Sequence, residues 1–193
     1  EERAKRLLQQ GAVIGNTFQQ RVLKRVTDIE EQVDVYLDRL EGMEFIFAQA
    51  GGAELEYIFK HLLSHEVAYN SLLIARRRLF HRRIGACLEE LYANRLESHL
   101  DMLAHHYYRG GTWLKALEYA QSAGGNAKRL YANQEAEQYF SRVLEIVDRL
   151  EQGKVDLFED ETPPQVAPEI LARYRREALG ERGDVRSLVG QFD

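Results

Sequence analysis

The apolar residues of this chain mostly recur three, four and seven positions apart, which is the spacing of one buried face of an α-helix. Near the N-terminus the pattern predicts a short helix over residues 1–10, which Gly11 ends. A second helix follows Phe18, and a third begins with Asp28 as its N-cap and stops at Gly42. The N-terminal region is therefore predicted to hold three short helices.

Two short runs of aromatic and β-branched residues then interrupt the helical pattern, Phe45–Gln49 and Tyr57–Phe59. Small residues and glycines separate the two runs, so we predict one small β-hairpin as the only sheet of the chain. Three short helices followed by a hairpin form the order of a winged helix, in which the hairpin is the wing. We therefore predict a winged-helix-like module.

The helical spacing resumes after the hairpin. Two further stripes consist of Leu62, Leu63, Val67, Ala68, Leu72 and Leu73, and of Phe80, Ile84, Cys87, Leu88 and Leu91. Three more stripes follow Asn94: Leu100, Leu103, Ala104 and Tyr107; Trp113, Ala116, Leu117 and Ala120; and Ala136, Tyr139, Phe140, Val143, Leu144 and Val147. Each stripe predicts a helix that packs through one face.

Short connections between the last three helices predict that neighbours run antiparallel. Gly110 and Gly111 form one such connection, and the pair Gly124-Gly125 is predicted to break or kink the middle helix. Residues 151–168 lose the helical spacing and carry acids and prolines, which indicates an acidic mobile loop. One more helix is predicted from Ile170 to Leu179.

The length of 193 residues permits two small domains. The fold class predicted from the pattern is mainly α, with a winged-helix-like module and linking helices at 1–94, followed by antiparallel helical hairpins at 95–193. The chain begins without Met and its last residues stop within the pattern, so we expect it to be a piece of a longer polypeptide.

Composition narrows the class of function. The formal net charge of -5 opposes tight non-specific binding to nucleic acid, which depends on Lys and Arg displacing phosphate counterions. The third predicted helix is also acidic on its outer face. Its acids are Glu30, Glu31, Asp34, Asp38 and Glu41. Only one cysteine, Cys87, is present, and the sequence has neither a signal core nor a membrane-spanning run, so we expect a cytoplasmic protein.

The helices after Asn94 follow the tetratricopeptide pattern of bulky, small and aromatic residues in two overlapping placements. The first placement uses Leu100, Leu103, Ala104, Tyr107, Ala116 and Ala120, and the second uses Gly124, Ala127, Ala136 and Phe140. The anchor alanines Ala116 and Ala136 lie closer together than the ~34 residues of a regular repeat. We therefore predict degenerate tetratricopeptide-like hairpins, the last of them truncated.

The order of a winged helix, the run Tyr57–Tyr69 and repeat hairpins resembles the STAND-class signalling ATPases, in particular the bacterial large ATPases joined to adenylate cyclase, kinase or transcription-factor domains. The resemblance implies a nucleotide-binding domain upstream, with ATP or ADP bound there, on which the winged helix packs. It also implies that the repeats sense a ligand or partner. The Gly-rich phosphate loop is absent from this sequence, so we expect this chain to be no enzyme and to hold no cofactor itself.

His61 is the candidate for nucleotide sensing. Relatives in apoptosis and plant immunity carry a winged-helix His, within a Met-His-Asp motif, that contacts the ADP phosphate. Here the corresponding residues are Lys60, His61 and Leu62, so only the His is retained. The resemblance implies that His61 contacts phosphate, while the plainer interpretation is a capping or packing His where a strand meets a helix.

A metal site is not expected. His61, His65 and Glu66 lie near one another in sequence, but the His-Glu-x-x-His pattern fails because Tyr69 occupies the second His position. The adjacent pair His105-His106 diverges around its helix.

The strongest basic run comprises Arg76, Arg77, Arg78, Arg82 and Arg83, which are candidates for docking onto an acidic or nucleotide-bearing domain. The spacing places Arg78 and Arg82 opposite the apolar stripe, with Arg76 and Arg83 flanking it. The plainer interpretation is a solvated helix face.

The aromatic residues Tyr107, Tyr108, Trp113 and Tyr119 are candidates for lining a partner groove, as in other helical repeats. Aromatic residues at these spacings also fill helix interfaces, which is the competing interpretation.

The hypothesis that joins these features is a regulatory fragment that relays nucleotide state and binds a protein partner or output domain. Two alternatives stay open: a repeat scaffold without nucleotide sensing, and a winged-helix transcription regulator that contacts DNA.

Overall fold

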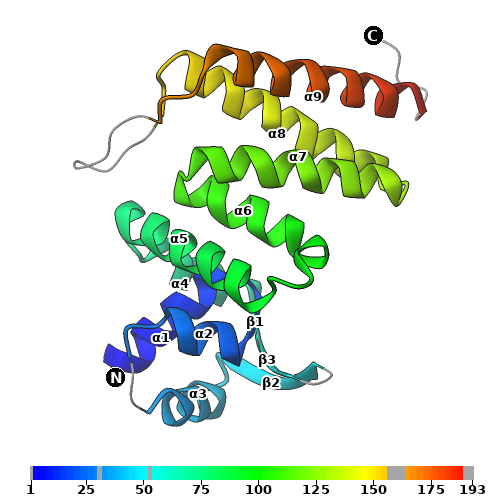
Figure 1. Cartoon of the computed structure of the whole chain (residues 1–193). Coiled ribbons are helices and arrows are strands. Elements are labelled where there is room, and N and C mark those ends of the chain that lie inside the picture. Colours follow the sequence, from blue (N-terminus) through cyan, green and yellow to red (C-terminus); the bar gives the residue numbers. More distant parts are fainter. Residues whose placement is uncertain (1, 30–31, 52–53, 156–163, 189–193) are drawn as a thin grey trace. The chain divides into compact units, whose positions relative to one another are not determined.

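The structure is a computed structural model that describes residues 2–29, 32–51, 54–155 and 164–188. The described residues are mainly helical, with one small antiparallel sheet, and the mainly α class is confirmed (Figure 1). The chain divides into two compact units, Glu1–Glu90 and Leu91–Asp193.

The first unit contains both kinds of element. In chain order they are α1 (Glu2–Ile14), β1 (Thr17–Gln19), α2 (Gln20–Val26), α3 (Val33–Gly42), β2 (Ile46–Gly51), β3 (Glu54–Phe59), α4 (Leu62–Asn70) and α5 (Ile74–Leu91). Apolar side chains from these helices and from the sheet form its core. Fully buried members include Leu7, Leu23, Leu37, Ile46 and Ile84.

The sheet of the first unit has three strands in the order β1-β3-β2, all antiparallel. The predicted hairpin is present, but the prediction that it is the only sheet structure is wrong, because β1 pairs with β3 on the other side. In that pairing Phe18 lies opposite Tyr57, and its ring also lies 5.9 Å from the ring of Phe59. A strand of three residues is too short to reveal an alternating pattern.

Helix α1 continues past Gly11 to Ile14, so the predicted helix end and the apolar loop after it are wrong. Gly11 serves close packing instead. A Cβ atom added there would lie 3.0 Å from Cζ of Phe18, so the ring occupies the space that a side chain would need. The buried residues Ala12, Val13 and Ile14 extend the apolar face of the helix and favour its last turn.

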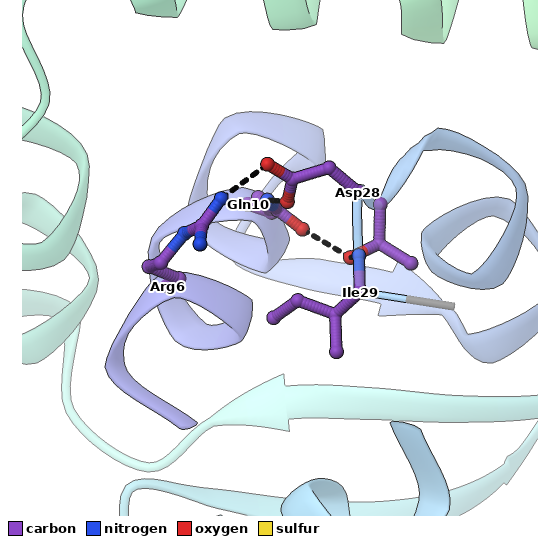
Figure 2. Close-up of polar contacts among 5 residues, drawn as sticks. Arg6, Gln10, Asp28 and Ile29 are labelled. Atoms are coloured by element: carbon purple, nitrogen blue, oxygen red, sulfur yellow. Dashed lines mark hydrogen bonds and ion pairs between the residues drawn. The ribbon is translucent and has the colours of Figure 1, made fainter. Parts of the chain in front are cut away.

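Asp28 is not an N-cap, because α3 begins only at Val33, after Gln32 in a left-handed conformation with φ 64°. Asp28 instead ties the segment before α3 to α1 (Figure 2). The buried Gln10 side chain donates a hydrogen bond of 2.6 Å to Asp28, Arg6 forms an ion pair with the same carboxylate, and Thr27 donates to Gln10. Partial burial would raise the pKa of Asp28, but the contacts with Gln10 and Arg6 outweigh it and lower the pKa.

The second unit consists of helices in sequence. They are η1 (Leu96–His99), α6 (Leu100–Gly110), α7 (Trp113–Arg129), α8 (Asn133–Glu151) and α9 (Pro168–Leu188). The three helices predicted after Asn94 match α6, α7 and α8, and the last helix is longer than the predicted Ile170–Leu179. Neighbours run antiparallel, since Arg175 pairs with Asp148 at one end of the α8–α9 pair and Arg186 pairs with Glu137 at the other.

Helix α7 is continuous through Gly124 and Gly125, so the predicted break is wrong. Gly124 is the point at which the Phe140 ring of α8 meets the backbone of α7. A Cβ atom on Gly124 would lie 2.7 Å from Cε1 of Phe140, which is too short for a non-bonded contact. Only glycine, which has no Cβ atom, fits at this position without a shift of the ring. The glycine therefore permits close helix packing.

Three parts of the sequence predictions fall outside the described residues: Glu30 and Glu31, most of the acidic loop at 156–163, and the chain end at 190–193.

Candidate protein-interaction surface

Helix α4 exposes apolar side chains to solvent. Leu62 is 64% exposed, Leu63 69% and Val67 61%, and we call these three residues the α4 face. The sequence predicts a packed stripe here, but of its α4 residues only Ala68 is buried. Apolar side chains clustered on an exposed helix indicate a surface that another molecule covers.

Two apolar hollows share α1 as a wall, and the first of them borders the α4 face. One, of about 340 Å³, lies between α1 and α4 and the other, of about 330 Å³, lies between α1 and α3. Lys5, Leu8 and Phe45 line both hollows, so we treat them as one feature, the α1 groove. Leu63 and Val67 of the α4 face also line the first hollow. The face and the groove therefore form one continuous apolar surface.

Hydrogen bonds fix the position of α4 against α1. The Gln9 side chain donates to Oγ of Ser71 at 2.8 Å, and Ser71 in turn donates to the carbonyl oxygen of Ala68 at 2.6 Å. Nε2 of His65 donates to the carbonyl oxygen of Ala12 at 2.9 Å, which defines the tautomer of that ring. These contacts hold the two walls of the first hollow together.

Aromatic contacts continue from His65 in two directions. Its ring meets the edge of Phe59 in β3 at 5.1 Å and stacks on Tyr69 at 6.4 Å. The Tyr69 hydroxyl lies 3.1 Å from Nε2 of the buried His81 in α5. Helix α4 is thus in contact with the sheet and with α5 through its polar aromatic residues.

The rim of the α1 groove is charged. Lys5 lines both hollows, and Arg39 lines the second one together with Glu2. In the parts of the chain that the structure describes, the side chains of Lys5 and Arg39 have no ion-pair partner. Two uncompensated cations therefore border an apolar groove.

His61 occupies the N-cap position of α4, next to the α4 face. Its side chain is exposed and makes no capping hydrogen bond, so neither part of the plainer interpretation applies to it. The neighbouring Lys60 forms an ion pair of 2.8 Å with Glu44. The hydrogen bond and the charge of Lys60, with a smaller contribution from His61, lower the pKa of the Glu44 carboxyl. Phosphate contact by His61 stays a prediction.

The basic run on α5 does not form a single patch. Arg76 and Arg83 are exposed, whereas Arg78 and Arg82 are half-buried, which is the reverse of the predicted arrangement. Arg77 lies over the Tyr69 ring at 4.9 Å and donates a hydrogen bond to Asn70. Three of the five arginines, Arg77, Arg78 and Arg82, are thus partly covered by other parts of the protein. Docking by these arginines stays a prediction.

The predicted aromatic groove is engaged within the second unit. Tyr107 and Trp113 are buried, and Tyr108 and Tyr119 are half-buried. The rings of Tyr107 and Tyr119 stack at 5.6 Å, and those of Tyr108 and Trp113 meet edge to face at 5.9 Å. Arg142 of α8 lies 4.8 Å from the Tyr108 ring centre. These contacts favour the packing interpretation, while a role in partner binding stays a prediction.

The described residues contain no group of three or more His, Cys, Asp or Glu side chains that could hold a metal ion. The rings of His105 and His106 lie 5.3 Å apart, with His106 buried. Burial, and to a lesser degree His105, lowers the pKa of His106 to about 3. Within the same described ranges no helix is long and apolar enough to cross a membrane.

Comparison with known proteins gives no indication of function, so the α4 face and the α1 groove are the features from which a function can be argued. No protein-family model, no curated protein and no solved structure matches this chain.

Proposed function

We propose that this chain is a non-catalytic interaction and relay module, and that its first unit docks onto a neighbouring protein domain through the α4 face. The observation that carries the proposal is the exposure of Leu62, Leu63 and Val67, each more than 60%. Burying an aliphatic side chain is worth roughly 1.5–3 kcal/mol, so covering this face supplies a useful part of the free energy of a protein complex. A catalytic function has no comparable observation in its favour.

The topology of the first unit supports a winged-helix-like module. Its elements follow the order α1, β1, α2, α3, β2, β3, and β3 is the central strand of the sheet. The resemblance to STAND-class ATPases then suggests which domain covers the α4 face, namely a nucleotide-binding domain that holds ATP or ADP. His61, at the first turn of α4, would lie at that interface and respond to the bound phosphate. Such a module would work in the cytoplasm.

The second unit supports the binding half of the proposal. Its antiparallel helices and the close contact between Gly124 and Phe140 suit tetratricopeptide-like hairpins, which present extended surfaces to a protein partner or output domain. The same hairpins without nucleotide sensing would form a scaffold. The experiment below distinguishes such a scaffold from a module that relays nucleotide state.

Regulation through DNA is disfavoured by the acidic surface of α3. Asp34 and Asp38 are exposed there, and together with Glu41 they contribute, after burial, to raising the pKa of the Tyr57 hydroxyl. A recognition helix with this charge would repel phosphate. We expect no duplex binding in a mobility-shift assay even at low salt, and salt-dependent binding would instead support the transcription-regulator alternative.

The test of the proposal uses the native polypeptide that carries this chain. We expect the double substitution Leu63→Asp and Val67→Asp to change the dissociation rate of labelled ADP, or the basal activity, by about tenfold, since a carboxylate at a buried contact costs at least ~1.4 kcal/mol. Val35→Asp is the control for each single substitution, Leu63→Asp or Val67→Asp, because Val35 is also exposed (59%) but lies on α3, outside the α4 face.

A second variant separates relay from scaffold. His61→Ala should alter ADP retention if nucleotide state reaches α4. An effect of the Leu63 and Val67 double variant on ADP retention without any effect of His61→Ala would support docking through the α4 face without phosphate contact by His61, and an effect on basal activity alone would support a scaffold. Unchanged behaviour in both variants would refute the docking role of the α4 face.

A further inference from the structure

The rim of the α1 groove suggests which kind of partner the docking surface takes. We propose that the α1 groove binds an amphipathic helix of a partner protein whose apolar stripe is flanked by acidic residues. This inference rests on the proposed function, because Leu63 and Val67 belong both to the α4 face and to the groove.

The dimensions of the groove suit about two turns of helix. Its lining residues on α1 run from Glu2 to Gln9, which at 1.5 Å per residue corresponds to ~12 Å. A partner helix that uses side chains at positions i, i+3 or i+4, and i+7 presents its anchors over ~10 Å. The two hollows, of about 340 and 330 Å³, can thus each receive side chains from successive turns of one helix.

The chemistry of the floor favours a helix over an extended peptide. Leu8 and Phe45 lie between the hollows, and Met43, half exposed, gives the second hollow an adaptable wall. The polar groups Gln9 and Ser71 are already hydrogen-bonded to each other. An extended peptide would leave backbone groups without partners over this floor, whereas a helix satisfies its own.

The charges of the rim favour acidic flanks on that helix. Lys5 stands where the two hollows meet and Arg39 stands beside the second, and neither has an ion-pair partner within the described residues. Glu2 is the one carboxylate among the lining residues and belongs only to the second hollow. Two exposed ion pairs are together worth about tenfold in affinity, so an acidic helix should be preferred over a basic one by about that factor.

The experiment compares two synthetic peptides in fluorescence anisotropy with the 193-residue chain. Both carry the same leucine stripe on a helix of about 15 residues, and they differ only in having glutamates or lysines beside it. The acidic peptide should bind in the micromolar range, and the lysine peptide about tenfold more weakly. Equal binding of the two peptides would refute the charge selection.

Charge reversal locates the binding site. The double variant Lys5→Glu and Arg39→Glu should reverse the preference, whereas the control double variant Lys154→Glu and Arg176→Glu, which changes net charge equally at exposed sites of the second unit, should not. Circular dichroism checks that each variant is folded. A preference for the acidic peptide that the Lys5 and Arg39 variant leaves unchanged would place the site elsewhere and overturn the proposal.

Two other outcomes would also overturn it. Failure of both peptides to bind means that the groove takes no such helix, and self-association that competes with the peptide means that a second copy of the chain is the occupant. The proposed function is judged separately, by ADP retention in the Leu63 and Val67 double variant. A changed ADP retention without peptide binding would therefore refute this inference alone.

Discussion

Helices α4 and α8 both carry several apolar side chains, yet they place them differently. In α4 Ala68 is the buried residue, and three larger aliphatic side chains face solvent. In α8 the apolar face is covered by neighbouring helices, with Phe140, Val143 and Val147 fully buried. The apolar face of α8 is therefore covered within the second unit, whereas nothing in the described residues covers the α4 face.

The largest effect should come from removing an anchor of α8. Phe140→Ala leaves a cavity against Gly124 and should lower the free energy of unfolding of the second unit by ~3–5 kcal/mol. The single tryptophan, Trp113, belongs to this unit, so its fluorescence in a urea titration measures the effect. A loss below ~1 kcal/mol would contradict the view that α8 is a packed core helix.

The buried His106 should make the second unit sensitive to mild acid. Its pKa is about 3 in the folded chain and near 6.5 when unfolded, so below ~6.5 the unfolded state binds the proton more readily. The free energy of unfolding is therefore unaffected by His106 above pH ~6.5. Between that pH and a pH of about 3 it falls by up to ~1.4 kcal/mol for each pH unit. An NMR titration of the imidazole signals checks this, and protonation of His106 near pH 6 would contradict it.

A smaller loss is expected at the contact between α1 and the segment before α3. Gln10→Leu removes the bonds to Asp28 and Thr27 and should cost ~1–2 kcal/mol, because partly buried polar groups lose their partner. Hydrogen exchange of the α1 amides measures it. The lowered pKa of Asp28 adds stability above ~3.8 that is lost as the pH falls below that value, and its partial exposure keeps this contribution small.

The smallest effect on stability should come from the α4 face. Leu63→Asp should change the free energy of unfolding by less than ~0.5 kcal/mol, because the Leu63 side chain is mostly exposed and buries little apolar area on folding. Thermal unfolding followed by circular dichroism tests this. A loss as large as that of Phe140→Ala would mean that α4 is packed within the chain and would remove the contrast with α8.

The sequence alone predicts the second unit better than the first, for physical reasons. The long helices α6, α7 and α8 repeat their apolar spacing over several turns, and the stripes led by Leu103, Ala116 and Phe140 are indeed buried. Strand β1 is too short to carry a period, and Gly11, a usual helix end, lies inside α1, where the absence of a side chain leaves room for the Phe18 ring.

The candidate site could not be predicted in the same way. An apolar stripe reports amphipathicity, and it does not say whether the chain itself covers that stripe, so Leu62, Leu63 and Val67 were predicted as packed. The α1 groove joins Lys5, Phe45 and Val67, which lie far apart in sequence. Only the folded unit brings these residues together.

The exposed α4 face also bears on how cells would handle this chain before a partner arrives. An uncovered aliphatic patch is the kind of surface through which proteins aggregate and on which chaperones act. Covering Leu63 and Val67 would then protect the chain from aggregation as well as transmit a signal. The abundance of the protein would consequently follow the abundance of whatever covers α4.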